Sequence, residues 1–219
     1  MKINKFIDHT LLKATATISE IENLCKEAVT YDFFSVCVNS AFVPYAKEFL
    51  QGTNVKICSV VGFPLGAMSS EAKVFETQQA ITSGADEIDM VLNVGLLKSG
   101  AKEKVREEIA FIKKVCGEKV LKVILETCYL TDAEKLLACQ LSVEAGADFV
   151  KTSTGFGSGG ATLADVALMK EAVNGKAKIK ASGGVRDYQT AMDYINAGVQ
   201  RIGTSNGIAI VTGSKGEGY

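Results

Sequence analysis

Short apolar runs alternate with amphipathic stretches along the whole chain. The apolar runs are typical of buried strands and lie at 5–8, 34–38, 56–61, 87–92, 122–126, 149–151, 178–182 and 200–203. Patterns typical of helices lie between them, for example at 19–31, 70–83, 101–116, 131–145, 162–173 and 187–197. Such alternation implies right-handed crossover units and a parallel sheet.

Eight strand–helix units within 219 residues favour an α/β fold of the closed (β/α)8 type, a TIM barrel. The phrases SGADEID, EAGADFV and NAGVQRI support repeated units, because each places glycine at a helix end directly before a strand. An open doubly wound sheet would give the same alternation and stays an alternative. We expect residues 1–219 to form one domain, with a flexible tail at about 213–219.

Charged residues occupy alternate positions of several predicted strands. In a closed barrel, alternate strand residues point inward, and active sites lie at the carboxyl ends of the strands. Asp89, Lys151 and Lys180 fit that position best. Lys122, Glu87 and Lys178 lie nearer strand starts, where we expect internal ion pairs or contact with solvent. A one-sided sheet with a solvated face would also produce this alternation.

Lys151 and Lys180 lie on successive strands, which run about 4.8 Å apart in a sheet. Two ammonium groups at about 4 Å repel by roughly 4 kcal/mol when the effective dielectric constant is near 20. That repulsion favours loss of one proton, and a neutral amine can form a Schiff base with a carbonyl. Asp89 could then carry protons to and from the carbinolamine. A single strand-end lysine more often extends to solvent, but two lysines and an acid together favour catalysis.

Glycine-rich turns follow the last three predicted strands. They read TSTG at 152–155, SGGV at 182–185 and GTSNG at 203–207. Glycine allows backbone N–H groups to approach an anion, and the loops after strands seven and eight of such barrels often bind phosphate. Arg186 could add to the attraction. The turns therefore predict a phosphorylated carbonyl substrate.

Composition excludes several other classes of function. Lys and Arg number 24 against 25 Asp and Glu, which gives no support for a nucleic-acid or membrane-surface partner. The N-terminus does not resemble a signal peptide and no apolar run could span a bilayer, so we expect a cytoplasmic protein. Six cysteines without a C-x-x-C pair and a single histidine, His9, predict reduced thiols and neither a metal nor another cofactor.

Six segments resemble the deoxyribose-phosphate aldolase family: FIDHTLLK (6–13), EIDMVLNVG (87–95), LKVILET (121–127), DFVKTSTGF (148–156), IKASGGVR (179–186) and RIGTSNG (201–207). The resemblance implies reversible cleavage of 2-deoxy-D-ribose 5-phosphate to D-glyceraldehyde 3-phosphate and acetaldehyde, and it leads us to expect a homodimer. Another class I aldolase of sugar phosphates, or a non-catalytic sugar-phosphate binding barrel, remains an alternative.

The resemblance also implies roles for individual residues. Lys151 would form the Schiff base, Lys180 would tune it, and Asp89 would act as the acid and base through a water. The residues expected to border the substrate and its phosphate are Thr154, Gly155, Gly183, Gly184, Gly203, Thr204 and Ser205. Asp8 and Lys122 would support the lysines from behind.

Two positions near the expected site vary among relatives. The C-terminal Tyr219 resembles a tyrosine that enters the site in some members and aids proton transfer. Phe156 stands where some members carry a lysine, so the phosphate would depend on backbone amides or other cations.

Overall fold

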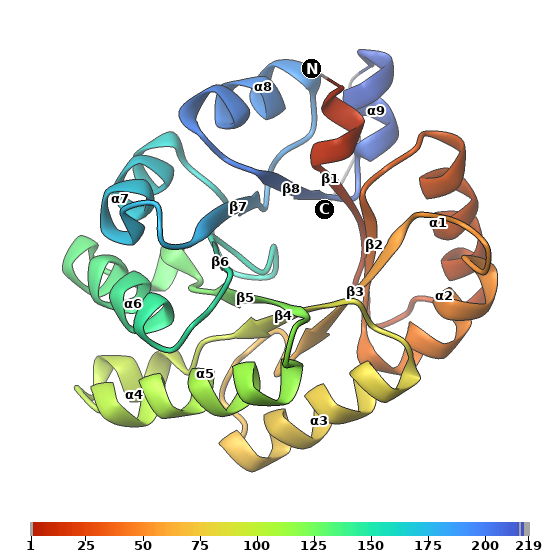
Figure 1. The fold of residues 1–219 in the computed structure, drawn as a ribbon. Coiled ribbons are helices and arrows are strands. Elements are labelled where there is room, and N and C mark those ends of the chain that lie inside the picture. The colour runs from red at the N-terminus through yellow and green to blue at the C-terminus, as the bar shows by residue number, and fades with distance from the viewer. Residues whose placement is uncertain (1, 215, 217–219) are drawn as a thin grey trace.

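A computed structural model describes residues 2–214 and 216. Its eight strands form a closed ring in which each strand pairs in parallel with the next, and the last pairs with the first (Figure 1). The predicted TIM barrel is confirmed, and the open sheet is excluded because β8 and β1 are hydrogen-bonded.

The strands are short, as expected for a small barrel. Their bounds are β1 Ile7–Leu11, β2 Ser35–Val38, β3 Lys56–Val61, β4 Glu87–Val91, β5 Val120–Ile124, β6 Phe149–Lys151, β7 Lys178–Ser182 and β8 Arg201–Thr204.

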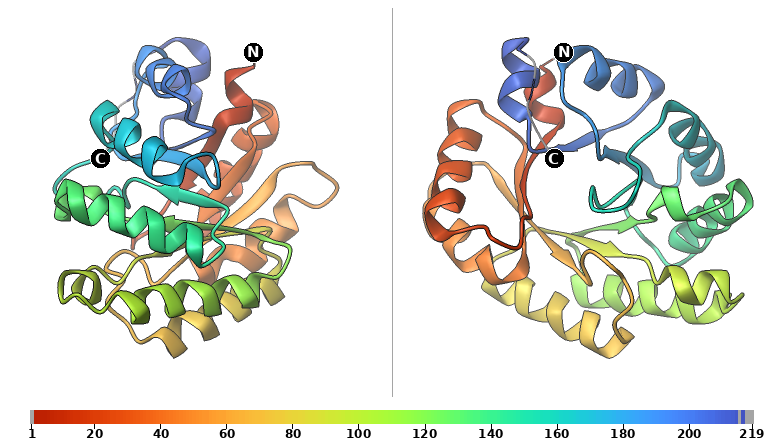
Figure 2. Two further views of the ribbon diagram at one scale, coloured as in Figure 1. Left: turned by 60° about the vertical axis from the view of Figure 1, so that its left-hand side comes forward. Right: turned by 180° about the vertical axis from the view of Figure 1, so that it is seen from behind.

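Helices surround the barrel in each of the further views (Figure 2). Their bounds are α1 Ile18–Thr30, α2 Val43–Phe49, α3 Ser70–Ser83, α4 Val94–Lys98, α5 Lys102–Cys116, α6 Asp132–Glu144, α7 Leu163–Val173, α8 Tyr188–Ala197 and α9 Gly207–Thr212. Within the described ranges, none of these helices has the length and apolarity needed to cross a bilayer.

Local sequence fixes where the helices begin and end. At the start of α1 the Thr17 side chain accepts the backbone N–H of Glu20, and the Glu20 carboxylate accepts the backbone N–H of Thr17, which makes a capping box. Thr131 and Glu134 form the same arrangement at the start of α6. Gly84 ends α3 at φ 115°, a left-handed conformation that glycine adopts without steric cost. These capping residues determine where the chain enters or leaves each of these helices.

Two strands start two residues away from the start that the sequence pattern predicts, whereas β2 and β8 start one residue later than predicted. The first strand was predicted at 5–8, but residues Ile3–Phe6 form a 3₁₀ turn, and β1 starts at Ile7. The fifth was predicted at 122–126, but β5 ends at Ile124, so Glu126 lies beyond the strand. In both segments charged residues sit at the strand boundary, where alternation alone does not fix the limit.

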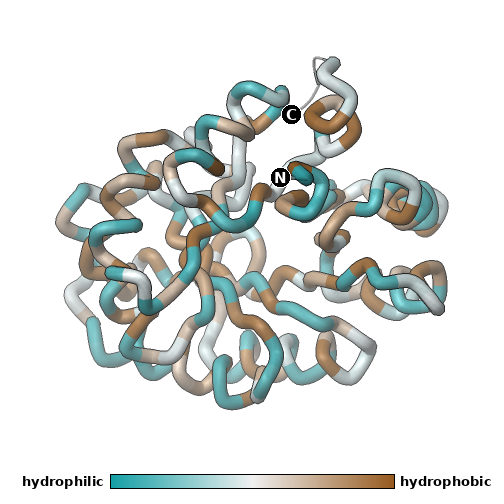
Figure 3. Tube along the Cα trace, turned by 45° about the horizontal axis from the view of Figure 1, so that its top comes forward, coloured by the Kyte–Doolittle hydropathy of each residue, from teal (hydrophilic) through white to brown (hydrophobic). Residues whose placement is uncertain are grey.

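The two faces of the barrel wall differ in chemistry. Apolar strand residues such as Val36, Ile88, Val123 and Val150 are fully buried within the main hydrophobic core cluster. Hydrophobic and hydrophilic positions are therefore interleaved along the chain (Figure 3). The interior face instead carries buried charges, which form the site described next.

Candidate active site

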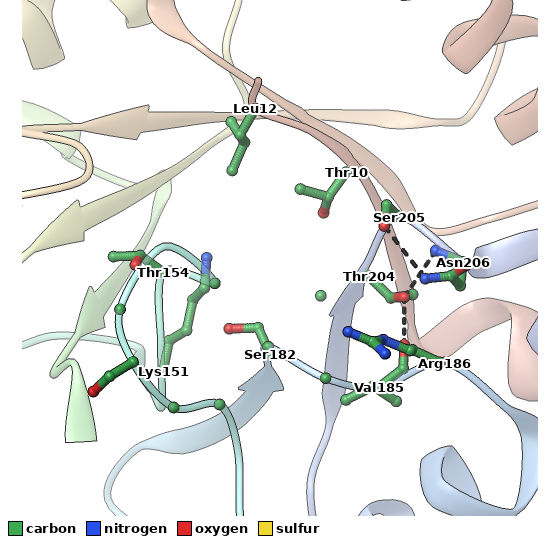
Figure 4. Close-up of a pocket in the computed structure, with 18 residues that line it drawn as sticks. Thr10, Leu12, Lys151, Thr154, Ser182, Val185, Arg186, Thr204, Ser205 and Asn206 are labelled. Atoms are coloured by element: carbon green, nitrogen blue, oxygen red, sulfur yellow. Dashed lines mark hydrogen bonds between the residues drawn. The ribbon is translucent and has the colours of Figure 1, made fainter. Parts of the chain in front are cut away.

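A cavity of about 290 Å³ opens at the carboxyl ends of the strands. Lys151 lines it, together with all seven residues that were expected to border the substrate, namely Thr154, Gly155, Gly183, Gly184, Gly203, Thr204 and Ser205. Figure 4 shows Lys151 and Thr154 across the opening from Thr204, Ser205 and Arg186, with Ser182 between them. The structure thus gathers residues from β6, β7 and β8 around one opening.

Lys151 and Lys180 meet at one carboxylate. Their Nζ atoms lie 2.9 Å and 2.8 Å from the same oxygen, Asp89 Oδ2. Lys180 and Asp89 are fully buried, and Lys151 is almost so. The proximity predicted for the two lysines is therefore observed, because Lys151 and Lys180 are direct partners in the β6–β7 register.

Carboxylates offset the repulsion that was expected between the two ammonium groups. Asp89 contacts both amines, and Lys180 also pairs with Asp8 Oδ2 at 2.5 Å. Burial disfavours the charge on Lys180, but Asp8 and Asp89 outweigh it and raise the pKa of Lys180 above its ordinary value. The two carboxylates therefore favour the charged form of Lys180.

A buried ion-pair network supports these groups from the lower part of the barrel. Lys122 Nζ lies 2.8 Å from Asp89 Oδ1 and 2.6 Å from Glu87, and Arg201 bonds to both Asp8 and Glu87. Burial opposes ionisation of Asp89, but Lys122, Lys151 and Lys180 together hold the pKa of Asp89 well below its usual range. Asp8 and Lys122 thus lie directly behind the lysine pair, as the sequence had suggested.

The other charged strand residues lie either in an internal ion pair or in contact with solvent. Glu87 and Lys122 form the internal ion pair, whereas Lys178, at the start of β7, is exposed. Lys122 lies in the middle of β5 rather than at its start, which explains why it reaches Asp89. Tyr219 lies outside the described residues.

Close backbone approach explains two of the glycines. A Cβ on Gly203 would stand 2.9 Å from Lys180 Cε, so this glycine makes room for the lysine side chain. Gly183 has φ +85° and packs against Gly160, where a Cβ would meet the Gly183 carbonyl oxygen at 2.2 Å. The glycines thus bring the loops after β6 and β7 into direct contact.

Comparison with known proteins identifies the family of this chain. The sequence model for the DeoC/LacD family of aldolases matches residues 3–212. The chain belongs to this family. It is 58% identical to a deoxyribose-phosphate aldolase of Brevibacillus brevis, over all of both chains. The resemblance noted in the sequence is therefore confirmed.

Solved structures of aldolases share the fold. A putative deoxyribose-phosphate aldolase from Coccidioides immitis superimposes with a TM-score of 0.95 at 41% identity, covering 96% of this chain and 85% of that one. A deoxyribose phosphate aldolase from Aeropyrum pernix, whose structure is described as a unique tetramer, gives 0.88 at 33% identity and covers 96% and 89%.

This member of the DeoC/LacD family has an aromatic contact beside the pocket. Phe156, in the loop after β6, meets Phe63 of the loop after β3 edge to face, with ring centroids 5.2 Å apart. Phe63 also packs against a small apolar cluster of Leu12, Cys37, Cys58 and Val60. Of these apolar residues, Leu12 lines the pocket, and Phe156 lies in the loop that forms part of its wall.

Sequence reasoning missed several residues of this aldolase site. Arg201 shares a strand face with Gly203, and the alternation that revealed Lys180 could have revealed it. Cys58 donates to Asp89 Oδ1 at 3.1 Å, and Cys37 lies beside it, so two thiols and a carboxylate converge where no sequence spacing indicated a cluster. Lys122 Nζ lies against both Cys58 and Asp89, which favours a hydrogen-bonded cluster over a metal site.

Proposed function

We propose that this protein is a class I aldolase that reversibly cleaves 2-deoxy-D-ribose 5-phosphate to D-glyceraldehyde 3-phosphate and acetaldehyde. The observation that carries the proposal is the amine of Lys151, which lines the pocket while sharing one oxygen of Asp89 with Lys180. The names of the relatives at 56–58% identity support the same substrate.

The reaction begins with addition of Lys151 Nζ to the C1 aldehyde of the open-chain sugar. The carbinolamine loses water and becomes an iminium ion, whose positive nitrogen attracts the electrons of the C2–C3 bond. When the C3 hydroxyl loses its proton, that bond breaks, glyceraldehyde 3-phosphate leaves and an enamine stays on Lys151. A proton added at C2 and attack by water then release acetaldehyde and the free amine.

In this proposal Asp89 and Lys180 move the protons. Asp89 is ionised before substrate binds and can accept a proton from the C3 hydroxyl, directly or through a water. Lys180 carries a proton and its Nζ lies 2.8 Å from Asp89 Oδ2, so it can exchange a proton with Asp89 after each transfer. Glycine turns after β7 and β8, with Arg186 at their edge, would bind the phosphate.

Reductive trapping tests the proposal. Borohydride added with deoxyribose 5-phosphate should give an adduct of the wild-type protein that peptide mass spectrometry locates at Lys151. Lys151→Met should fold and give no adduct and no turnover. Tight binding of the sugar phosphate without an adduct would instead favour a non-catalytic binding barrel, and turnover in Lys151→Met would contradict the mechanism.

Substrate preference and assembly complete the proposal. Faster turnover of another sugar phosphate would favour a different class I aldolase. We further propose a cytoplasmic homodimer that needs no cofactor, nucleic acid or membrane. Sedimentation of the purified protein tests the dimer, cell fractionation tests the location, and unchanged activity after treatment with a chelator tests the absence of a metal.

A further inference from the structure

Glu126 has a backbone conformation that is unusual for its residue type. It lies just beyond β5 with φ 55° and ψ 65°, in the left-handed region that glycine and asparagine adopt more readily. Its side chain is only 2% exposed. Backbone strain of this kind persists where surrounding structure requires it, and such positions cluster at functional sites.

The contacts of Glu126 explain what holds it there. Its carboxylate accepts the backbone N–H of Thr154 at 3.3 Å and also a short hydrogen bond from the Thr154 hydroxyl. Among the residues that the structure describes, no ion pair includes Glu126. Since Thr154 lines the pocket three positions after Lys151, this buried carboxylate acts on the pocket wall.

The same carboxylate also lies beneath the rest of the loop after β6. A Cβ on Gly157 would stand 3.2 Å from Glu126 Oε1 and 2.8 Å from the sulfur of Cys128. The loop continues to Gly160, which packs on Gly183 of the next turn. Glu126 therefore connects the end of β5 to the loop after β6, which forms the pocket wall between Lys151 and the glycine turns.

Hydrogen-bond polarity gives the contact a chemical consequence. A threonine hydroxyl has one proton to donate and two positions at which it can accept. Thr154 gives its proton to Glu126, and one acceptor position receives the N–H of Phe156 at 3.0 Å. What it can offer to a ligand is the remaining acceptor position, which suits a hydroxyl group and not a phosphate oxygen.

We propose that Glu126 is a positioning residue that makes Thr154 a reader of a substrate hydroxyl rather than part of the phosphate site. The inference rests on the proposed aldolase function and assigns one determinant of its specificity. In the condensation direction, the hydroxyl that it would read is the one at C2 of glyceraldehyde 3-phosphate. An acceptor aldehyde that has the phosphate but lacks this hydroxyl should be disfavoured.

The test measures acceptor preference with acetaldehyde as the donor. The ratio of kcat/KM for D-glyceraldehyde 3-phosphate to that for 3-oxopropyl phosphate, which lacks the hydroxyl, should be at least about tenfold in the wild-type protein. In Thr154→Val and Glu126→Gln it should fall to within about threefold of unity. Thr154→Ser, which keeps the hydroxyl, should restore the preference.

Glu76→Gln is the matched control. Glu76 holds another active-site loop in a similar way, because it accepts the Gly62 N–H and the Ser40 hydroxyl at 2.8 Å each, and the same substitution there should leave the ratio unchanged. If Glu126→Gln does not fold, Glu126→Asp keeps the charge but shortens the reach, and it should lower the ratio in the same way. A wild-type ratio retained in Thr154→Val or in the folded Glu126 variant would overturn the proposal.

Trapping with acetaldehyde separates this inference from the proposed function. Acetaldehyde has no hydroxyl, so borohydride should trap it on Lys151 in Glu126→Gln as it does in the wild type. Absence of an adduct in the wild type would refute the aldolase function itself. An adduct in the wild type but none in Glu126→Gln would show that Glu126 acts on Lys151, which also overturns the role assigned here.

Discussion

Replacing Lys180 with methionine removes one charge from the centre of the barrel while keeping most of the side-chain volume. Lys180 Nζ lies 2.5 Å from Asp8 and 2.8 Å from Asp89, and the side chain is fully buried. Breaking a buried pair by removing one partner costs about 3–5 kcal/mol. We expect the lower end, because Arg201 still pairs with Asp8 and Lys151 still pairs with Asp89.

The effect on the chemistry of Lys151 should be larger than the effect on folding. Both amines contact the same oxygen, so their nitrogens lie close together. At about 5 Å and an effective dielectric constant near 20, two ammonium groups repel by roughly 3 kcal/mol. Without Lys180 that repulsion no longer favours the reaction of Lys151 with an aldehyde, and about 3 kcal/mol corresponds to a rate about 100-fold lower.

The rate of borohydride-dependent trapping of acetaldehyde at Lys151 measures this change. In Lys180→Met it should fall about 100-fold at pH 7. Lys178→Met, the same substitution at an exposed position of the same strand, should trap at the wild-type rate. A Lys180→Met rate within threefold of the wild type at pH 7 would refute the reasoning.

Three further predictions concern stability and phosphate binding. Because neighbouring cations lower the folded-state pKa of Asp8 and Asp89, the stabilisation that these residues give is complete above about pH 4 and is lost as the pH falls below it; urea unfolding between pH 5 and 2.5 should show a steep decline, and a flat profile would contradict it. Phe156→Lys adds a cation to the loop after β6, so KM for deoxyribose 5-phosphate should fall a few-fold while trapping of acetaldehyde stays unchanged; an equal change in both would contradict a phosphate-specific effect. Glu108→Gln leaves Lys73, which is fully buried and 2.7 Å from Glu108, without its counter-charge; denaturant unfolding should show a loss of about 3 kcal/mol, and a loss below 1 kcal/mol would count against the pair.

The cluster of Asp89, Lys151 and Lys180 could be predicted from the sequence because strand geometry is local. Side chains alternate between two faces with period two, so Asp89, Lys151 and Lys180 could be assigned to the inner face once the strands were located. Lys151 ends β6 as expected, whereas Asp89 and Lys180 lie in the middle of β4 and β7 and not at the carboxyl ends where they were expected. Lys151 and Lys180 lie opposite each other because successive strands pair in register, and the structure has them as direct partners.

The partners of Lys180 were harder to predict because they depend on closure. Asp8 comes from the first strand and reaches Lys180 only because β1 pairs with β8, in a register that sets Asp8 opposite Gly203. The absence of a side chain at Gly203 leaves room for the lysine between them. The role of Glu126 could not be predicted from the sequence either, because it depends on β5 ending at Ile124, two residues earlier than the pattern indicates.

The charges of the network also account for which lysine can be the nucleophile. Within the described part of the chain, Lys122, Lys151, Lys180 and Arg201 share three carboxylates, those of Asp8, Glu87 and Asp89. With every group ionised, the buried interior would carry an excess positive charge, which is costly away from water. Loss of one proton balances it. Lys151 makes a single ion pair and lines the pocket, whereas Lys122, Lys180 and Arg201 each bridge two carboxylates. Lys151 is therefore the amine of the network with the fewest ion pairs and the one that can meet an aldehyde in the pocket.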